Sequence, residues 1–245
     1  HVFADGGRIG EIFAGGCYCT LIGSQVVNGR TRAVELVITG GRLGGDDLRV
    51  FGGGERGEVH GDIYVRMEGD AAIDSQLVGG SNAGTVNGNI EMDLITGSAF
   101  RVDAAGLGWY EYYGPNVDPY YEPAKINGDV QVNLYRAGTS ANDSTDIFRL
   151  GTVADIDPAS RLVGGIYGGM ETTNHVEIIK PGAESTLHFA ESARYELATI
   201  GENGYDTSAE SVIVTGFDRF SLENGTHVVL GLGLFDRDMD PSEEL

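Results

Sequence analysis

The residues of this sequence that could do chemistry include a group of carboxylates close to its end. Asp236, Asp238 and Asp240 alternate with other residues, and Glu244 follows four positions later. Oxygen donors at this spacing can wrap a Ca²⁺ ion, although Pro241 stands where known loops of this kind place a glycine. The segment predicts either a Ca²⁺ site or a solvated acidic tail, and no other cofactor is expected.

A second group of candidate residues is aromatic. One tryptophan and five tyrosines lie within 13 residues, namely Trp109, Tyr110, Tyr112, Tyr113, Tyr120 and Tyr121. Such rings provide a large contact area at low entropic cost, dominate recognition surfaces, and can stack on sugars. Two interpretations stay open: the segment binds a host or environmental glycan or protein, or its rings fold back over an open edge of the structure.

Signals for catalysis are weak. The run Gly52-x-Gly54-x-x-Gly57 matches a dinucleotide fingerprint, but a strand pattern follows where that motif requires a helix. Asp62 and Asp129 occupy equivalent repeat positions, yet Asn89 stands at the matching position between them. No Ser-His-Asp signature is visible. We expect no catalytic residues and keep a carbohydrate-active enzyme, a lyase or hydrolase with paired carboxylates, as the alternative.

Composition argues against several partners. The net charge is −21, from 37 acidic and 16 basic residues. Nucleic acids and anionic membranes both require a basic surface, so neither is expected to bind. No apolar run is long enough to insert into a membrane. Cys17 and Cys19 lack a second pair that could complete a zinc site, and we expect them to pack as free thiols on one face of a strand.

Internal repeats are the strongest signal in the chain. An apolar pair followed by glycines recurs at 12–16, 50–54, 77–80 and 166–169. A second unit, a glycine turn followed by alternating apolar residues, covers 57–67, 84–94 and 125–134, with weaker copies at 33–38 and 174–179. In 90–94, for example, Ile90, Met92 and Leu94 alternate with acidic residues. This period of two predicts strands with one buried face.

The spacing of the repeats predicts how the strands are arranged. Gly61 and Gly88 are 27 residues apart, and Gly53 and Gly79 are 26 apart. Glycine is also abundant, at 39 of 245 residues, which favours many tight corners. A period of this size, built from strands and corners, predicts an all-β solenoid whose coils stack into parallel sheets around one core. An antiparallel sandwich would not produce this periodic pattern.

Two segments interrupt the repeat. The aromatic residues fall in a predicted loop insertion at about 105–124, and a polar stretch at 139–158 predicts a second loop. After residue 181 the pattern fits strands, but Phe189, Ala193, Leu197 and Ile200 also fit a helix. We predict a single domain over 1–234, with 235–245 as an acidic tail or the start of another domain.

Two segments resemble known repeat proteins. Val50-Phe51-Gly52-Gly53-Gly54, followed by Gly57 and by Val59-His60-Gly61-Asp62-Ile63, resembles the glycine-rich repeats of large bacterial surface proteins. The segment 216–226 resembles late coils of autotransporter passengers. The resemblance implies a right-handed parallel β-helix, export to the extracellular space or cell surface, and a role in adhesion. It implies no catalytic residues.

These observations predict a non-enzymatic, adhesin-like stalk or passenger segment that combines a rigid scaffold with a binding loop. Besides the carbohydrate-active enzyme, a self-assembling fibre component with end-to-end association is the remaining alternative, because the ends of a solenoid are open.

Overall fold

The computed structural model describes residues 1–18, 20–23, 25–27, 30–45, 48–111, 120–139, 147–150, 165–169, 179–197 and 213–229. Every regular element in these ranges is a strand, so the all-β prediction is confirmed for them. The helical alternative after residue 181 is wrong for β20 (Ser185–Phe189) and β21 (Arg194–Glu196). There, Leu187 and Phe189 alternate with polar residues, and both are buried.

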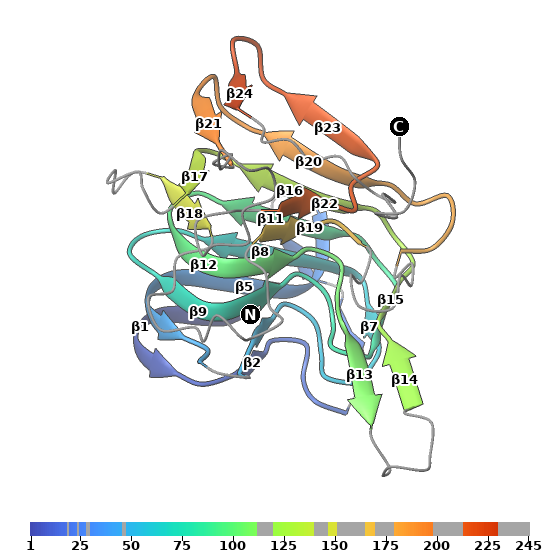
Figure 1. Ribbon diagram of the computed structural model, residues 1–245. Helices are drawn as coiled ribbons and strands as arrows, with labels where there is room; N and C mark the ends of the chain where they lie inside the picture. Colours follow the sequence, from blue (N-terminus) through green and yellow to red (C-terminus); the bar gives the residue numbers. More distant parts are fainter. Residues whose placement is uncertain are drawn as a thin grey trace.

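Successive passes of the chain place one strand each in a first stack (Figure 1). The stack contains β1 (Val2–Ile9), β5 (Arg30–Leu43), β8 (Asp62–Met67), β11 (Ile90–Leu94), β16 (Val130–Leu134), β20 and β23 (Arg219–Leu222). Each strand pairs in parallel with the next one in this series.

Two further stacks lie beside the first. The second contains β2 (Ile12–Phe13), β6 (Val50–Phe51), β9 (Ala72–Val78), β12 (Gly97–Asp103), β19 (Gly165–Tyr167) and β22 (Ile213–Thr215). The start of β12 continues through β18 (Phe148–Leu150) to β17 (Ala137–Thr139), β21 and β24 (His227–Val229). The third contains β3 (Leu21–Ile22), β7 (Val59–His60), β10 (Thr85–Val86) and β15 (Lys125–Ile126). All of these pairings are parallel.

Antiparallel strand pairs in the described ranges are confined to local hairpins. β4 (Gln25–Val27) pairs with the start of β5, and β13 (Gly108–Glu111) pairs with β14 (Tyr120–Pro123). The strands that join distant parts of the sequence are parallel, as the repeats predict. This follows because a chain that returns to the same side on each pass runs in the same direction there.

The strand register explains the repeats. Ile63, Ile90 and Val130 lie opposite one another on β8, β11 and β16. In the glycine-rich unit, Val50 lies opposite Leu77 and Phe51 opposite Val78, and this offset of 27 makes Gly80, not Gly79, the counterpart of Gly53. The 26-residue interval is therefore one residue short, and both units repeat every 27 residues at these passes.

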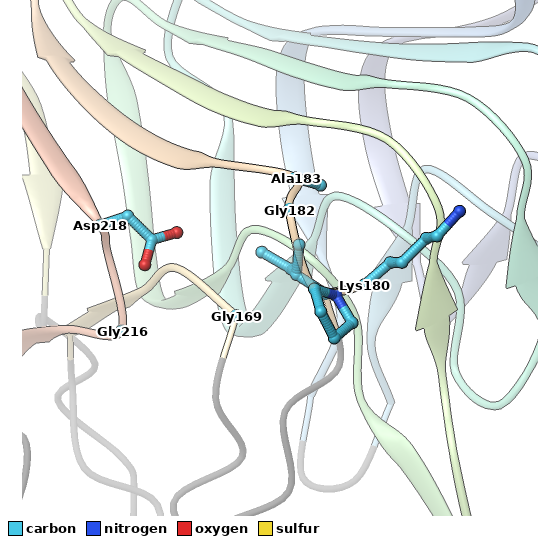
Figure 2. Close-up of a pocket in the computed structure, with 8 residues that line it drawn as sticks. Gly169, Lys180, Gly182, Ala183, Gly216 and Asp218 are labelled. Atoms are coloured by element: carbon cyan, nitrogen blue, oxygen red, sulfur yellow. The ribbon is translucent and has the colours of Figure 1, made fainter.

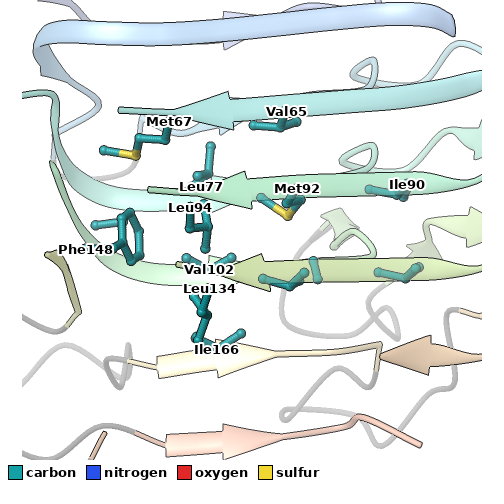
Figure 3. Close-up of a cluster of buried hydrophobic side chains, with 14 of the residues drawn as sticks. Val65, Met67, Leu77, Ile90, Met92, Leu94, Val102, Leu134, Phe148 and Ile166 are labelled. Carbon is teal, nitrogen blue, oxygen red and sulfur yellow. The ribbon is translucent and has the colours of Figure 1, made fainter. Parts of the chain in front are cut away.

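The core consists of aliphatic columns that run across the first stack and meet the second (Figure 3). Val65, Met92 and Val132 form one column, and each side chain is fully buried. Met67, Leu94 and Leu134 form the next, equally buried column; the second stack contributes side chains such as Leu77, Val102 and Ile166. Burying each such side chain stabilises the fold by about 1.5–3 kcal/mol. Because neighbouring passes bury these side chains together, a single pass would not be stable alone.

A glycine stands just before each of β8, β11 and β16, and local geometry explains all three glycines. A Cβ on Gly88 would lie 2.2 Å from the Gly61 carbonyl oxygen, and one on Gly128 would lie 2.4 Å from the Gly88 oxygen. Gly61 itself has a positive φ of 127°, which also favours glycine. The expected turn conformation thus explains Gly61, while the narrow gap between passes explains Gly88 and Gly128.

The insertion predicted at about 105–124 contains the β13–β14 hairpin, while Ala105 and Leu107 at its start are buried. Two other local predictions differ from the structure. Part of the predicted loop 139–158 is strand β18, because Phe148 packs into the core. Cys17 is exposed in a bend and does not pack as a buried thiol. Cys19 and positions 174–178 of the last weak repeat lie outside the described residues.

Candidate functional site

A hollow of about 350 Å³ lies on the outer face of the first stack. Two rows of side chains line it. Asp62, Asn89 and Asp129 stand at the corners where β8, β11 and β16 begin, and Tyr64, Glu91 and Gln131 stand two residues further along the same strands. Arg32, the third residue of β5, also lines the hollow. The hollow is therefore built from equivalent positions of three consecutive passes.

The corner side chains are fixed by hydrogen bonds to the neighbouring backbone. The Asn89 amide donates to Asp62 Oδ1 at 2.8 Å, and the Asp129 amide donates to Asn89 Oδ1 at 2.9 Å. The Glu184 amide continues the series by donating to Asp129 Oδ1 at 2.9 Å. We call Asp62, Asn89 and Asp129 the corner row. Each side chain satisfies an amide at the start of the next pass, where the strand pairing begins.

The uncharged side chain of Asn89 stands between the carboxylates of Asp62 and Asp129. Adjacent parallel strands lie about 4.8 Å apart, so three aspartates in this row would place like charges at that spacing. With Asn89 in the middle, Asp62 and Asp129 are two passes apart while the hydrogen-bond pattern is unchanged. Asn89 therefore interrupts the carboxylates over these three passes.

A polar network borders the hollow. The Tyr64 hydroxyl donates to Asp93 Oδ2 at 2.5 Å, and Asn133 Nδ2 donates to Asp93 Oδ1 at 2.8 Å. Burial, together with the hydrogen bond to Asp93, raises the pKa of Tyr64 well above its ordinary value of 10.0. The Arg32 guanidinium lies 3.7 Å from the centre of the Tyr64 ring and also contacts Glu35. Tyr64 is therefore a neutral, fixed donor that supports the floor of the hollow.

A second, smaller hollow of about 140 Å³ lies between Gly169, Gly182 and Gly216 (Figure 2). Lys180 and Asp218 line it, but the Lys180 side chain extends away from Asp218. Asp218 Oδ2 accepts a hydrogen bond from the Ser185 amide at 2.9 Å. The two charges do not converge, so this hollow is a weaker candidate than the one over the corner row.

The aromatic residues proposed as binding groups map onto the β13–β14 hairpin. Its strands pair Trp109 with Glu122 and Tyr110 with Tyr121, and Tyr120 pairs with Glu111. The Ala124 amide donates to the Leu107 carbonyl at 2.7 Å and closes the base of the hairpin. The hairpin projects away from the stacks (Figure 1). Tyr112 and Tyr113 lie outside the described residues.

The proposed Ca²⁺ ligands also lie outside the described residues, namely Asp236, Asp238, Asp240 and Glu244. Within the part of the chain that the structure describes, no group of three or more His, Cys, Asp or Glu side chains is placed to hold a metal ion. The same ranges contain no helix that could cross a membrane.

A buried ion pair lies on the second stack. The Arg101 guanidinium bonds Asp103 through two nitrogens, the shorter contact being 2.5 Å, and Gln76 Nε2 donates to Asp103 at 3.1 Å. Arg101 also stacks on the Tyr167 ring, with 3.9 Å between its Cζ and the ring centre. Because Arg101 and Asp103 are only 6% and 4% exposed, this pair has a structural role.

Sequence reasoning identifies the corner row as equivalent positions but misses the hollow beside it. In the sequence, Tyr64, Glu91 and Gln131 stand out only as residues that alternate with the core. Each of them stands three residues after a corner glycine, namely Gly61, Gly88 or Gly128. This common offset could have indicated that the three side chains share one face. Comparison of the chain with family models, with curated proteins and with solved structures finds no match in any of the three.

Proposed function

We propose that the chain is a right-handed parallel β-helix over residues 1–234 that acts as a non-enzymatic scaffold and presents a binding hairpin. The observation that supports this best is the register: the passes that begin with β1, β5, β8 and β11 visit the first, second and third stacks in the same order, and consecutive passes pair in parallel. Connections between parallel strands of one sheet are right-handed in nearly all proteins, which agrees with the family resemblance.

The hairpin is suited to recognition because it is added to the scaffold without disturbing it. The chain leaves the core after Leu107 and returns at Ala124, and the hydrogen bond between these residues holds the base together. Aromatic residues occupy both strands of the hairpin. A glycan or a protein surface is the proposed ligand, bound through aromatic contact area.

The proposed setting is the extracellular space or the cell surface, as part of an adhesin-like stalk or passenger. A net charge of −21 supports solubility of a long, sheet-rich particle. The glycine-rich repeats resemble those of bacterial surface proteins, and the buried aliphatic columns would provide the stiffness that a stalk requires.

A glycan array and a protein-binding screen test the proposal. The wild type is compared with a Trp109→Ala, Tyr113→Ala double variant, and Tyr18→Ala serves as a matched control, because Tyr18 is 69% exposed and lies on another loop. We expect the double variant to lose at least tenfold in affinity, and the control to bind like the wild type. Binding that survives the double variant would refute a role for the hairpin.

A carbohydrate-active enzyme is the second candidate, and the hollow favours it because Asp62, Glu91 and Asp129 line one face. Paired carboxylates are the usual catalytic groups of glycoside hydrolases. However, Asp62 and Asp129 each accept a backbone hydrogen bond, which is a structural role. Release of new reducing ends or of unsaturated products from polysaccharides, abolished by Glu91→Gln, would establish this alternative in place of the scaffold.

Self-assembly is favoured by one observation at the two ends of the first stack. Phe3 on β1 is 56% exposed and Leu222 on β23 is 52% exposed. Light scattering over a range of concentrations tests whether copies associate end to end; a monomer at all concentrations would exclude it.

A further inference from the structure

We propose that the hollow over β8, β11 and β16 binds a neutral oligosaccharide, with the corner row as its main contact. This site is separate from the hairpin, and it does not depend on the hairpin's proposed role. The hollow, of about 350 Å³, spans three consecutive passes and has polar side chains at regular intervals. A chain of sugar rings can extend along such a surface.

The corner row is preorganised. One oxygen of each of Asp62, Asn89 and Asp129 accepts a backbone amide hydrogen bond, which fixes the side chain. The remaining polar atom of each, Asp62 Oδ2, Asn89 Nδ2 and Asp129 Oδ2, has no hydrogen-bond partner among the residues that the structure describes. Groups held in place before binding lose little entropy when a ligand arrives, so their hydrogen bonds contribute more to affinity.

The order of these atoms selects hydroxyl groups. Along the row, an acceptor is followed by a donor and then by another acceptor, at intervals of about 4.8 Å. A sugar hydroxyl can donate to a carboxylate and accept from an amide, so neighbouring hydroxyls match the whole row. An ammonium group only donates, and the NH₂ group of Asn89 would oppose it. The pattern therefore favours a polyol over a polyamine.

The charge of the hollow selects a neutral sugar over an acidic one. Asp62, Glu91 and Asp129 line it together with a single cation, Arg32. Arg32 already contacts Glu35 and the Tyr64 ring. A uronic or sialic acid would meet a lining in which three carboxylates outnumber one guanidinium, and would be repelled, whereas an uncharged hexose would not.

Isothermal titration calorimetry with the full chain tests this inference. The probes are pentasaccharides of glucose, mannose and galactose, with pentagalacturonate and spermidine as the charged alternatives. Asn89→Asp keeps the oxygen that binds the Asp129 amide but replaces the donor by an acceptor. Asn87→Asp is the matched control, because Asn87 lies two residues away, does not line the hollow, and keeps its acceptor oxygen for Asn127.

Asp129→Asn is the second variant, and it guards against a trivial effect of charge. It keeps the oxygen that accepts the Glu184 amide and removes a negative charge, where Asn89→Asp adds one. We expect at least one neutral pentasaccharide to bind, with affinity at least tenfold lower in both Asn89→Asp and Asp129→Asn and unchanged in Asn87→Asp. Thermal melts of each variant confirm that it is folded.

Four outcomes would overturn the inference. Binding of spermidine or pentagalacturonate in place of the neutral sugars would mean that the hollow selects charge. Neutral sugars that bind equally to Asn87→Asp and Asn89→Asp would place the site elsewhere, and loss only in the Trp109 variant would assign it to the hairpin. No binding by any probe would leave the hollow without the proposed ligand class.

Discussion

The replacement of Gly88 by alanine is the most informative single change in the scaffold. The added Cβ would lie 2.2 Å from the Gly61 carbonyl oxygen and 2.8 Å from the Asp62 nitrogen, and both are backbone atoms. Since carbon and oxygen atoms normally approach no closer than about 3.0–3.4 Å, the two passes must separate by about 1 Å at this corner.

The expected cost has two parts. Overpacking in a rigid interior costs about 1–3 kcal/mol. The separation also weakens the bonds beside the corner, from the Asn89 amide to Asp62 and from the Asn87 amide to the Val59 carbonyl, at about 1 kcal/mol each. We therefore expect a loss of about 3–5 kcal/mol. For a chain of this size, that corresponds to a decrease in Tm of about 6–20 °C.

Thermal unfolding followed by circular dichroism measures this effect. Gly6→Ala is the control, because a Cβ at Gly6 would have no atom within 4 Å and the φ of Gly6 is not positive. We expect the Gly6 variant to stay within about 0.5 kcal/mol of the wild type. If Gly88→Ala melts at the wild-type temperature, the close approach of consecutive passes at the corner glycines is wrong.

Four other variants test the core, the buried ion pair and a buried phenol. Met92→Ala should destabilise the fold by about 2–5 kcal/mol in urea unfolding, because it opens a cavity in a fully buried column; a loss below about 1 kcal/mol would contradict that position. Asp103→Ala should cost about 3–5 kcal/mol by leaving the Arg101 charge buried, and Arg101→Met together with Asp103→Leu should recover part of this loss. Burial raises the pKa of Tyr195 from 10.0 to about 12, so its contribution is complete below pH 10 and is lost as pH rises to 12. Tyr195→Phe should therefore show a smaller decrease in Tm over that range, and identical decreases would count against it.

The repeating part of the fold could be predicted because each pass repeats the same local rules. Ile90, Met92 and Leu94 alternate with polar residues, and a glycine precedes each copy of this strand, so the register followed from the spacing. The error of one residue at Gly79 arose because two adjacent glycines fit the pattern equally. The register of β6 against β9, in which Phe51 lies opposite Val78, distinguishes them.

The irregular parts could not be predicted in the same way. Phe148 lies in a polar stretch whose composition indicates a loop. However, the strand β18 that contains it pairs with the start of β12, and the Phe148 side chain is buried in the core. Cys17 is exposed because it lies in a bend between β2 and β3, and no repeat in the sequence marks this bend. The hollow depends on which outer side chains of different passes lie together, and this follows from register and twist, which are properties of the assembled sheet.

An engineered disulfide tests the in-register stacking most directly. Asn127 Nδ2 lies 2.6 Å from Asn87 Oδ1 on adjacent passes, although the residues are 40 positions apart in the sequence. In a chain with Cys17→Ser and Cys19→Ser, the pair Asn87→Cys and Asn127→Cys should oxidise completely, as measured by mass spectrometry of the digested protein. Asn87→Cys with Asp129→Cys, displaced by two residues to a separation of about 8 Å, should not. Equal oxidation of the two pairs, or oxidation of the displaced pair alone, would contradict the stacked, parallel arrangement on which both binding proposals rest.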